Sequence, residues 1–161
     1  MPEVRKAIPA DHDKIWVILQ EIIQQGDVFA WAVNSSKEEV LAYWCHPDKH
    51  TYVALEQGEI AGTFFMQNNQ PGLGSHVANA GYAVATKMAG RGIGKFMGEY
   101  SLAEAKKLGY TAMQFNLVVK SNEKAVALWK KIGFEIIGEI PDAFKHAKNG
   151  LTNAYIMYRK L

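Results

Sequence analysis

The sequence lacks the features of disulfide-stapled, exported and membrane-spanning proteins. One cysteine, Cys45, cannot build an internal disulfide framework, and no second Cys or His stands at zinc-binding spacing from it. No run approaches the roughly 20 apolar residues that cross a bilayer, and the first residues lack the apolar core of a signal peptide. These absences predict a cytoplasmic protein with no metal site and no membrane partner.

An excess of charge of one sign is also missing. Lys and Arg number 18 against 16 Asp and Glu, and no basic block is present that could follow a phosphate backbone. Nucleic acid is therefore not an expected partner. The length of 161 residues, 48% of them hydrophobic, is typical of one ordinary domain, so we expect residues 1–161 to form a single domain.

Apolar periodicity predicts a mixed α/β protein. Helices are expected up to Gly26, after the capping box of Ser36 and Glu39, and over residues 93–108 and 122–132. Expected strands cover residues 4–8, 51–55, 60–66, 76–84, 112–119, 134–140 and 154–158. Strands 51–55 and 60–66 form a hairpin, and a loop through Pro141, His146 and Gly150 separates strands 134–140 and 154–158.

A glycine-rich turn precedes the helix expected from residue 93. Glycines at 90, 92 and 94 let the backbone approach a ligand, and the first helical turn offers unpaired N–H groups at the positive end of the helix dipole. This pattern favours a diphosphate cradle, and its alternative is a plain connecting turn. The spacing matches neither the Walker P-loop nor the dinucleotide fingerprint.

The turn resembles the Gln/Arg-x-x-Gly-x-Gly/Ala fingerprint of the GNAT acetyltransferases, from which Ala89 departs at the first position. The resemblance implies a mixed, mostly antiparallel sheet of six to seven strands with about four helices, and acetyl-CoA as co-substrate. It also implies a backbone cradle for the diphosphate over residues Ala89, Gly90, Arg91, Gly92, Ile93, Gly94 and Lys95. The pantetheine arm would pair with the strand backbone at Tyr82, Ala83 and Val84.

A second segment, residues 122–134, resembles the family motif N-x-x-A-x-x-L-Y-x-x-x-G-F. Asn122 would lie beside pantetheine, or would only cap its helix. Trp129 replaces the usual tyrosine, which protonates the departing thiolate, and an indole cannot release a proton near neutral pH. Trp129 would then hydrogen-bond sulfur, wall the thioester pocket or pack in the core. A water, the departing ammonium or a phenol such as Tyr82 would return the proton.

Two asparagines stand inside apolar strands where an acceptor would bind. Asn79 and Asn116 must each find partners, because an unpaired buried amide costs of order 1–3 kcal/mol, and those partners are either protein groups or a ligand. Gly81 predicts a bulge or close ligand approach that would present a backbone N–H to the thioester oxygen. His76 is a candidate base or an ordinary surface histidine.

These strands are most similar to the fungal azetidine-2-carboxylate and proline-analogue N-acetyltransferases. The shared features are the S-H-x-x-N-A-G-aromatic strand, the F-N-L-V strand and Trp129, within residues 60–140. The resemblance implies that Asn79, Asn116 and the backbone of Leu117 contact an amino-acid-like acceptor. The N-terminal third shows no comparable match, and its aromatic residues would line the acceptor pocket or pack in the core: Phe29, Trp31, Tyr43 and Trp44.

The sequence thus predicts acetyl transfer from acetyl-CoA to a small-molecule amine by direct attack in a ternary complex, with no acidic base on the Asn79 strand. Two alternatives stay open. One is a non-catalytic acyl-CoA sensor, which the substitution at Trp129 favours, and the other is a protein or peptide N-acetyltransferase. Homodimerisation is a family tendency that no motif in the sequence indicates.

Overall fold

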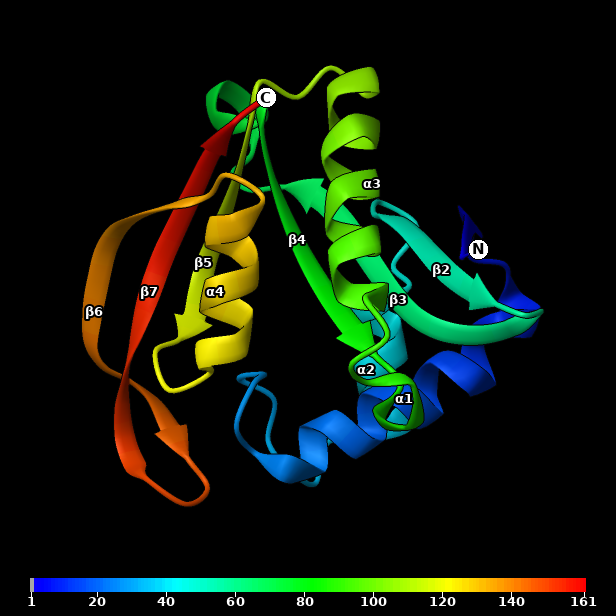
Figure 1. Cartoon of the computed structure of the whole chain (residues 1–161), viewed down its shortest axis with the longest axis horizontal. Helices are drawn as coiled ribbons and strands as arrows, with labels where there is room; N and C mark the ends of the chain where they lie inside the picture. The colour runs from blue at the N-terminus through cyan, green and yellow to red at the C-terminus, as the bar shows by residue number, and fades with distance from the viewer. Residues whose placement is uncertain (1) are drawn as a thin grey trace.

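A computed structural model describes residues 2–161. Within them, seven strands form one sheet in the order β1-β2-β3-β4-β5-β7-β6 (Figure 1). The strands are β1 (Glu3–Lys6), β2 (His50–Glu56), β3 (Glu59–Asn68), β4 (Val77–Val84), β5 (Ala112–Val119), β6 (Glu135–His146) and β7 (Gly150–Lys160). The helices are α1 (His12–Gln25), α2 (Lys37–Trp44), α3 (Ile93–Lys107) and α4 (Glu123–Lys131). The expected mixed sheet with about four helices is confirmed.

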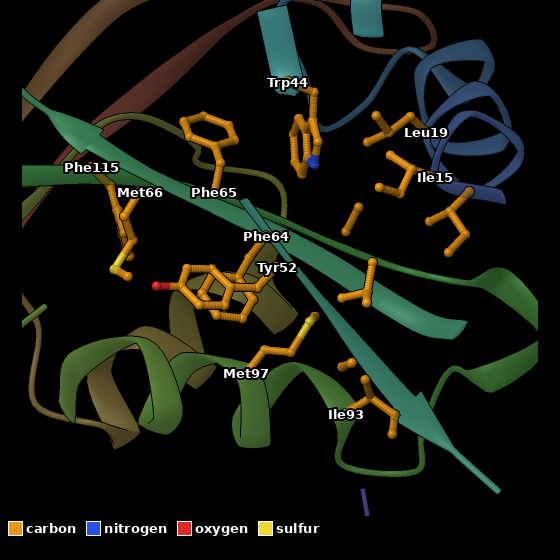
Figure 2. Close-up of a cluster of buried hydrophobic side chains, with 14 of the residues drawn as sticks. Ile15, Leu19, Trp44, Tyr52, Phe64, Phe65, Met66, Ile93, Met97 and Phe115 are labelled. Carbon is orange, nitrogen blue, oxygen red and sulfur yellow. The ribbon is translucent and has the colours of Figure 1, made fainter. Parts of the chain in front are cut away.

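Helices cover both faces of the sheet. Neighbouring side chains of a strand point to opposite faces, and both faces are covered, so strand β3 is buried along most of its length. Phe64 stacks on Tyr52 at 4.8 Å toward α3, whereas Phe65 meets Trp44 of α2 edge to face at 4.8 Å (Figure 2). The largest apolar side chains therefore fix α3 on one face and α1 with α2 on the other.

Two predicted helix caps and the predicted β2–β3 hairpin are present. Ser36 Oγ accepts from the Glu39 N–H at 3.1 Å and begins α2, and Asn122 Oδ1 accepts from the Ala125 N–H at 3.4 Å and begins α4. The β2–β3 hairpin turns through Gln57 and Gly58, both at positive φ. No helix in residues 2–161 is both long and apolar enough to cross a membrane.

The predicted loop through Pro141 and His146 is wrong, because β6 and β7 continue through it as one long hairpin. Proline and a positive-φ Asp142 are accommodated in an irregularity between Ile140 and Phe144, where the register shifts. The Asp142 N–H donates to Asn153 Oδ1 at 3.0 Å and closes this bulge.

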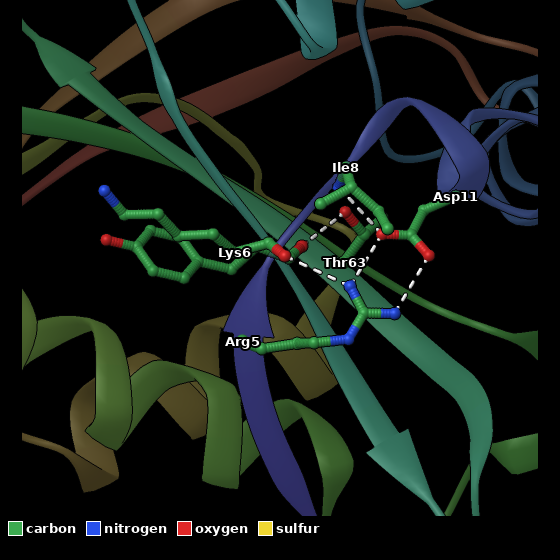
Figure 3. Close-up of polar contacts among 6 residues, drawn as sticks. Arg5, Lys6, Ile8, Asp11 and Thr63 are labelled. Carbon is green, nitrogen blue, oxygen red and sulfur yellow. Dashed lines mark hydrogen bonds and ion pairs between the residues drawn. The ribbon is translucent and has the colours of Figure 1, made fainter.

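A buried carboxylate joins β1 to the start of α1. Asp11 is the N-cap residue of α1, but its side chain makes no capping hydrogen bond to that helix. It accepts two hydrogen bonds from the Arg5 guanidinium, at 2.7 and 3.0 Å (Figure 3). The Ile8 N–H donates to the same carboxylate at 2.8 Å. Because these donors favour the charged form, they hold the pKa of Asp11 below its ordinary value, led by the Arg5 hydrogen bond.

Candidate functional site

The glycine-rich turn leads directly into α3. Gly90 and Gly92 have φ of 79° and 80°, a conformation that side-chain-bearing residues rarely adopt. Helical hydrogen bonding starts with the Phe96 N–H, which donates to the Gly92 carbonyl, so the preceding N–H groups of the first turn have no helical acceptor. Arg91 is exposed, and the Lys95 ammonium lies 3.6 Å from Glu99. This turn presents donors and positive charge to solvent, the chemistry that binds phosphate oxygens.

Strands β4 and β5 pair only at their first residues. Their parallel ladder joins Val77 to Ala112 and Ala78 to Met113, and the strands then separate toward the start of α3 (Figure 1). At the point of separation, Asn79 Nδ2 donates to the Gln114 carbonyl at 3.1 Å. The Asn79 side chain therefore donates to a carbonyl that would accept from the backbone in a regular parallel ladder, and the gap between the strands begins beyond this hydrogen bond.

The edge of β4 that faces this gap is set by strand parity. Val77 O accepts from the Asn69 N–H, and the Ala85 N–H donates to Ala61 O, so odd-numbered β4 residues direct their backbone groups toward β3. The backbone groups of Ala80, Tyr82 and Val84 consequently face the gap.

The prediction of a bulge at Gly81 is wrong, because β3–β4 pairing is continuous across it and its N–H faces β3. Position 81 requires a residue without a side chain for another reason. A Cβ there would lie 2.5 Å from Cε2 of Phe65, so the glycine makes room for an aromatic ring.

Two cavities adjoin along this edge. The first, of about 240 Å³, lies between β4, β5 and α4, and Tyr82, Val84, Gly94, Asn122 and Trp129 are among its lining residues. The second, of about 410 Å³, is lined mainly by aromatic side chains and amides: Phe29, Trp31, Tyr43, Trp44, Phe65, Asn79, Phe115 and Asn116, with Leu117 and the small residues Ala30, Ala80 and Gly81. We call these the channel and the acceptor cavity. Both include Ala80 and Gly81, so that segment is their junction.

An uncharged amide network borders the acceptor cavity. Gln67 Nε2 donates to Asn79 Oδ1 at 3.1 Å and to the Tyr43 hydroxyl at 3.3 Å. Asn116 Nδ2 donates to Asn69 Oδ1 at 2.7 Å, and Asn116 Oδ1 accepts from the Gln114 side chain at 3.0 Å. Each asparagine keeps spare hydrogen-bonding capacity, since an amide offers two donors and two lone pairs.

Trp129 and Tyr82 pack together beside the channel, with ring centroids 4.8 Å apart. The Tyr82 hydroxyl lies 2.6 Å from Ser101 Oγ, which itself donates to the Gly98 carbonyl, and burial raises the pKa of that phenol. The hydroxyl is therefore directed at α3 and ill suited to release a proton, and we assign it no acid role. The Trp129 indole N–H makes no hydrogen bond to any described residue.

Most of the sequence-predicted residues gather along the channel and at the acceptor cavity. Those that line the channel are Tyr82, Val84, Gly94, Asn122 and Trp129. Asn79, Asn116 and Leu117 meet at the acceptor cavity, and all four N-terminal aromatics expected there or in the core also line it. Ala83 and Ile93 are buried. The Ala83 backbone is directed at β3, where Ala83 pairs with Thr63, so the prediction that it pairs with pantetheine is wrong. The Ile93 N–H lies in the first turn of α3. The exposed His76 lines neither cavity.

Sequence reasoning missed Phe65, Phe115 and Gln67. Phe65 and Phe115 lie in strands whose apolar residues predict a buried core, and Gln67 lies just past the expected strand 60–66. Only tertiary packing places the three beside a cavity.

The loop between α1 and α2 forms part of both cavities and is tied to the far hairpin. Phe29 lines both cavities, and Trp31 lines the second. The Ala147 N–H, in the β6–β7 turn, donates to the Gly26 carbonyl at 3.0 Å where this loop begins. The C-terminal hairpin thus holds one end of the segment that covers the site.

Comparison with known proteins gives consistent results. The model of the acetyltransferase (GNAT) family matches residues 16–134. N-acetyltransferase aca1 of Schizosaccharomyces pombe is 32% identical over 111 residues, which are 68% of this chain and 53% of that protein. The chain therefore spans about half the length of this curated relative.

Solved structures agree with the family match. A GCN5-related N-acetyltransferase from Kribbella flavida superposes with a TM-score of 0.95 at 35% identity, covering 99% of this chain and 98% of that one. A phosphinothricin acetyltransferase from Sinorhizobium meliloti, solved in complex with acetyl-CoA, shares the fold with a TM-score of 0.87 at 21% identity, over 99% and 88% of the chains. The family match, the sequence relative and the shared fold together place this chain in the GNAT family of acetyltransferases.

Proposed function

We propose that the protein transfers the acetyl group of acetyl-CoA to the amine of a small molecule by direct attack in a ternary complex. The observation that carries this proposal is the gap between β4 and β5. It leads from the unpaired amides of α3, through the channel, to the acceptor cavity. A thioester whose diphosphate rests on those amides would therefore have its carbonyl beside a second substrate.

The start of α3 suits the diphosphate of the coenzyme. The N–H groups from Gly92 to Lys95 point out of the helix end with the positive end of its dipole, and Arg91 and Lys95 add charge. Ala89 lacks the side chain of the family's first fingerprint position, and we expect this loss to weaken the backbone cradle rather than abolish it.

The open edge of β4 suits the pantetheine arm. The backbone groups of Tyr82 and Val84 face the channel without a strand partner, so they can pair with the arm's amides in the way a strand would. Asn122 lines the same channel while it caps α4, so the two roles expected of it are compatible.

The thioester carbonyl would lie at the junction of the cavities. The Ala80 or Tyr82 N–H can donate to its oxygen and stabilise the negative charge that develops as the amine attacks. Asn79, Asn116 and the Leu117 backbone would hold the acceptor so that its neutral nitrogen faces the carbonyl carbon. A carbon–nitrogen bond forms, the carbon–sulfur bond breaks, and the amine's proton leaves through water while the thiolate takes one up.

Trp129 would assist the departing sulfur without protonating it. Its indole N–H is unpaired within residues 2–161 and the ring lines the channel, so it can hydrogen-bond the thiolate while solvent or the departing ammonium supplies the proton. This role explains how acetyl transfer proceeds without the family's tyrosine.

The test combines calorimetric binding of acetyl-CoA with thiol release over a panel of free amines and peptides. Gly92→Val forces a branched residue to positive φ in the cradle and should weaken acetyl-CoA binding about tenfold or more. Gly58→Val is the matched control, since Gly58 has φ of 81° and open space around it in the distant β2–β3 turn.

Three results would contradict the proposal. Absence of acetyl-CoA binding removes it altogether. Binding without turnover of any amine supports a sensor, and turnover of peptides alone supports a protein acetyltransferase.

A further inference from the structure

Asn79 is held between two neighbouring strands by partners that determine which way its amide faces. Asn79 Nδ2 donates to the backbone carbonyl of Gln114 on β5 at 3.1 Å, and Asn79 Oδ1 accepts from Gln67 Nε2 on β3 at 3.1 Å. A backbone carbonyl can only accept, so the nitrogen end of the Asn79 amide has to face β5. The oxygen end then faces β3, where Gln67 supplies the donor that it needs.

Gln67 supports this arrangement from outside the acceptor cavity. It is the cross-strand partner of Asn79 in the β3–β4 pair, so the two side chains lie on the same face of the sheet. Its amide nitrogen has two N–H groups and donates to both Asn79 Oδ1 and the Tyr43 hydroxyl, the latter at 3.3 Å. Within residues 2–161, Asn79 and Tyr43 line the acceptor cavity and Gln67 does not. An effect of Gln67 on the acceptor therefore acts through these two neighbours.

The orientation of the Asn79 amide matters because the acceptor cavity has an uncharged lining. In the described chain that lining consists of aromatic, aliphatic and amide side chains. Shape and hydrogen bonds are thus left to orient the acceptor, and each hydrogen bond depends on whether the cavity presents a donor or an acceptor at that point. The last torsion of an asparagine side chain is broad, so without fixed partners Asn79 would exchange its donor and acceptor ends.

We propose that Gln67 is a positioning residue that fixes the orientation of the Asn79 amide and thereby the pose of the acetyl acceptor. This inference rests on the proposed acetyl transfer. After its hydrogen bonds to Gln67 and Gln114, Asn79 keeps one N–H and one lone pair for the acceptor. Because the two protein contacts define where these groups point, they favour the one pose in which the acceptor nitrogen faces the thioester.

The first experiment measures the Asn79 amide without any substrate. Its ¹⁵N–¹H side-chain signals are identified by their loss in Asn79→Ser. The Asn79 proton held by the Gln114 carbonyl should exchange with solvent more slowly than the other proton on the same nitrogen. Gln67→Met keeps a side chain of similar length but removes both donors, and should accelerate exchange of the held proton about fivefold. The signals of Asn116, whose partners are Asn69 and the Gln114 side chain, should stay unchanged.

Gln67→Glu provides a readout that a merely structural role would not move. At pH 8 its carboxylate cannot donate to Asn79 Oδ1, so the Asn79 proton should exchange as fast as in Gln67→Met. Near pH 5 a larger fraction of the carboxyl group is protonated and can donate again. The ratio of the two Asn79 exchange rates should then return toward the wild-type ratio at the same pH, whereas Gln67→Met should show no such recovery.

The kinetic experiment uses acetyl-CoA and the amine that wild type acetylates fastest in the panel of free amines. Gln67→Met should lower kcat/KM for that amine about tenfold, because the reactive pose is less populated, while KM for acetyl-CoA stays within about twofold. Gln24→Met, at an exposed position of α1, is the matched control and should change neither the kinetics nor the Asn79 signals.

The outcomes separate this inference from the proposed function. Unchanged Asn79 signals in Gln67→Met would overturn the inference, and so would altered signals with an unchanged kcat/KM for the amine. Equal losses for the amine and for acetyl-CoA would also overturn it, because they would indicate general damage to the fold. A wild-type protein that acetylates no amine would reject the proposed function, whereas accelerated Asn79 exchange would still support the orientation of Asn79 by Gln67.

Discussion

Gly81→Ala is a sharp test of how the acceptor cavity is shaped. An added Cβ would lie 2.5 Å from Cε2 and 3.0 Å from Cζ of Phe65, distances that packed carbon atoms do not adopt. Phe65 cannot simply retreat, because it is 4% exposed and its ring meets Trp44 at 4.8 Å and Tyr43 at 5.8 Å. The ring must therefore move toward the acceptor cavity, which it lines.

Two opposing effects set the size of the change. Overpacking of this kind costs about 1–3 kcal/mol, whereas replacing glycine by alanine in extended backbone restores about 0.4–1 kcal/mol by restricting the unfolded chain. The clash is the larger effect, so the free energy of unfolding should fall by about 1–2 kcal/mol. For a chain of this length that corresponds to a Tm lower by about 2–8 °C.

The assay is thermal and denaturant unfolding of Gly81→Ala, Phe65→Leu and the double variant. Leucine lacks the ring atoms that the new Cβ would meet, so the double variant should recover at least about 1 kcal/mol relative to the sum of the single changes. Gly81→Ala should also raise KM for the acceptor more than KM for acetyl-CoA. Additive stabilities would refute the reasoning, because they would mean that Phe65 is not the obstacle.

The remaining predictions concern the ion pair between exposed Arg5 and buried Asp11, and the Trp129 indole. Asp11→Asn should lower stability by about 1–2 kcal/mol at pH 7. Because Arg5 depresses the pKa of Asp11, this stabilisation is complete above the ordinary carboxyl pKa and disappears as pH falls through the depressed one, so acid titration of both proteins should converge. Trp129→Phe should reduce the single-turnover rate constant of acetyl transfer about 5–30-fold while the affinity for acetyl-CoA stays unchanged. An unaltered rate constant would contradict the role of the indole.

Local signals in the sequence were sufficient for most of the fold. Caps such as Ser36 and Asn122 and the positive-φ glycines at 90 and 92 act within a few residues, so their patterns predict the helix starts and the turn before α3 correctly. The β6–β7 hairpin could not be predicted in the same way. Pro141 normally ends a strand, and only the partner strand's Asn153 provides the acceptor that keeps the bulge paired.

The candidate site was less accessible to sequence reasoning. Asn79 and Asn116 are conspicuous because polar residues interrupt apolar strands, and the structure brings both to one cavity. Of the two readings of Gly81, the bulge was wrong and the close ligand approach stays a prediction. The sequence could not indicate that this glycine makes room for Phe65, because that ring comes from another strand.

The hydrogen bond between Ala147 and Gly26 connects the β6–β7 turn, whose length can vary easily, to the α1–α2 loop, which lines the site. Hairpin turns accept insertions and deletions readily, whereas the strands that would hold the coenzyme do not. A longer or shorter β6–β7 turn would displace the α1–α2 loop, which carries Phe29 and Trp31. The shape of the acceptor cavity would then change although the turn itself does not line it. Substrate preference could then diverge among relatives through a turn that touches neither reactant.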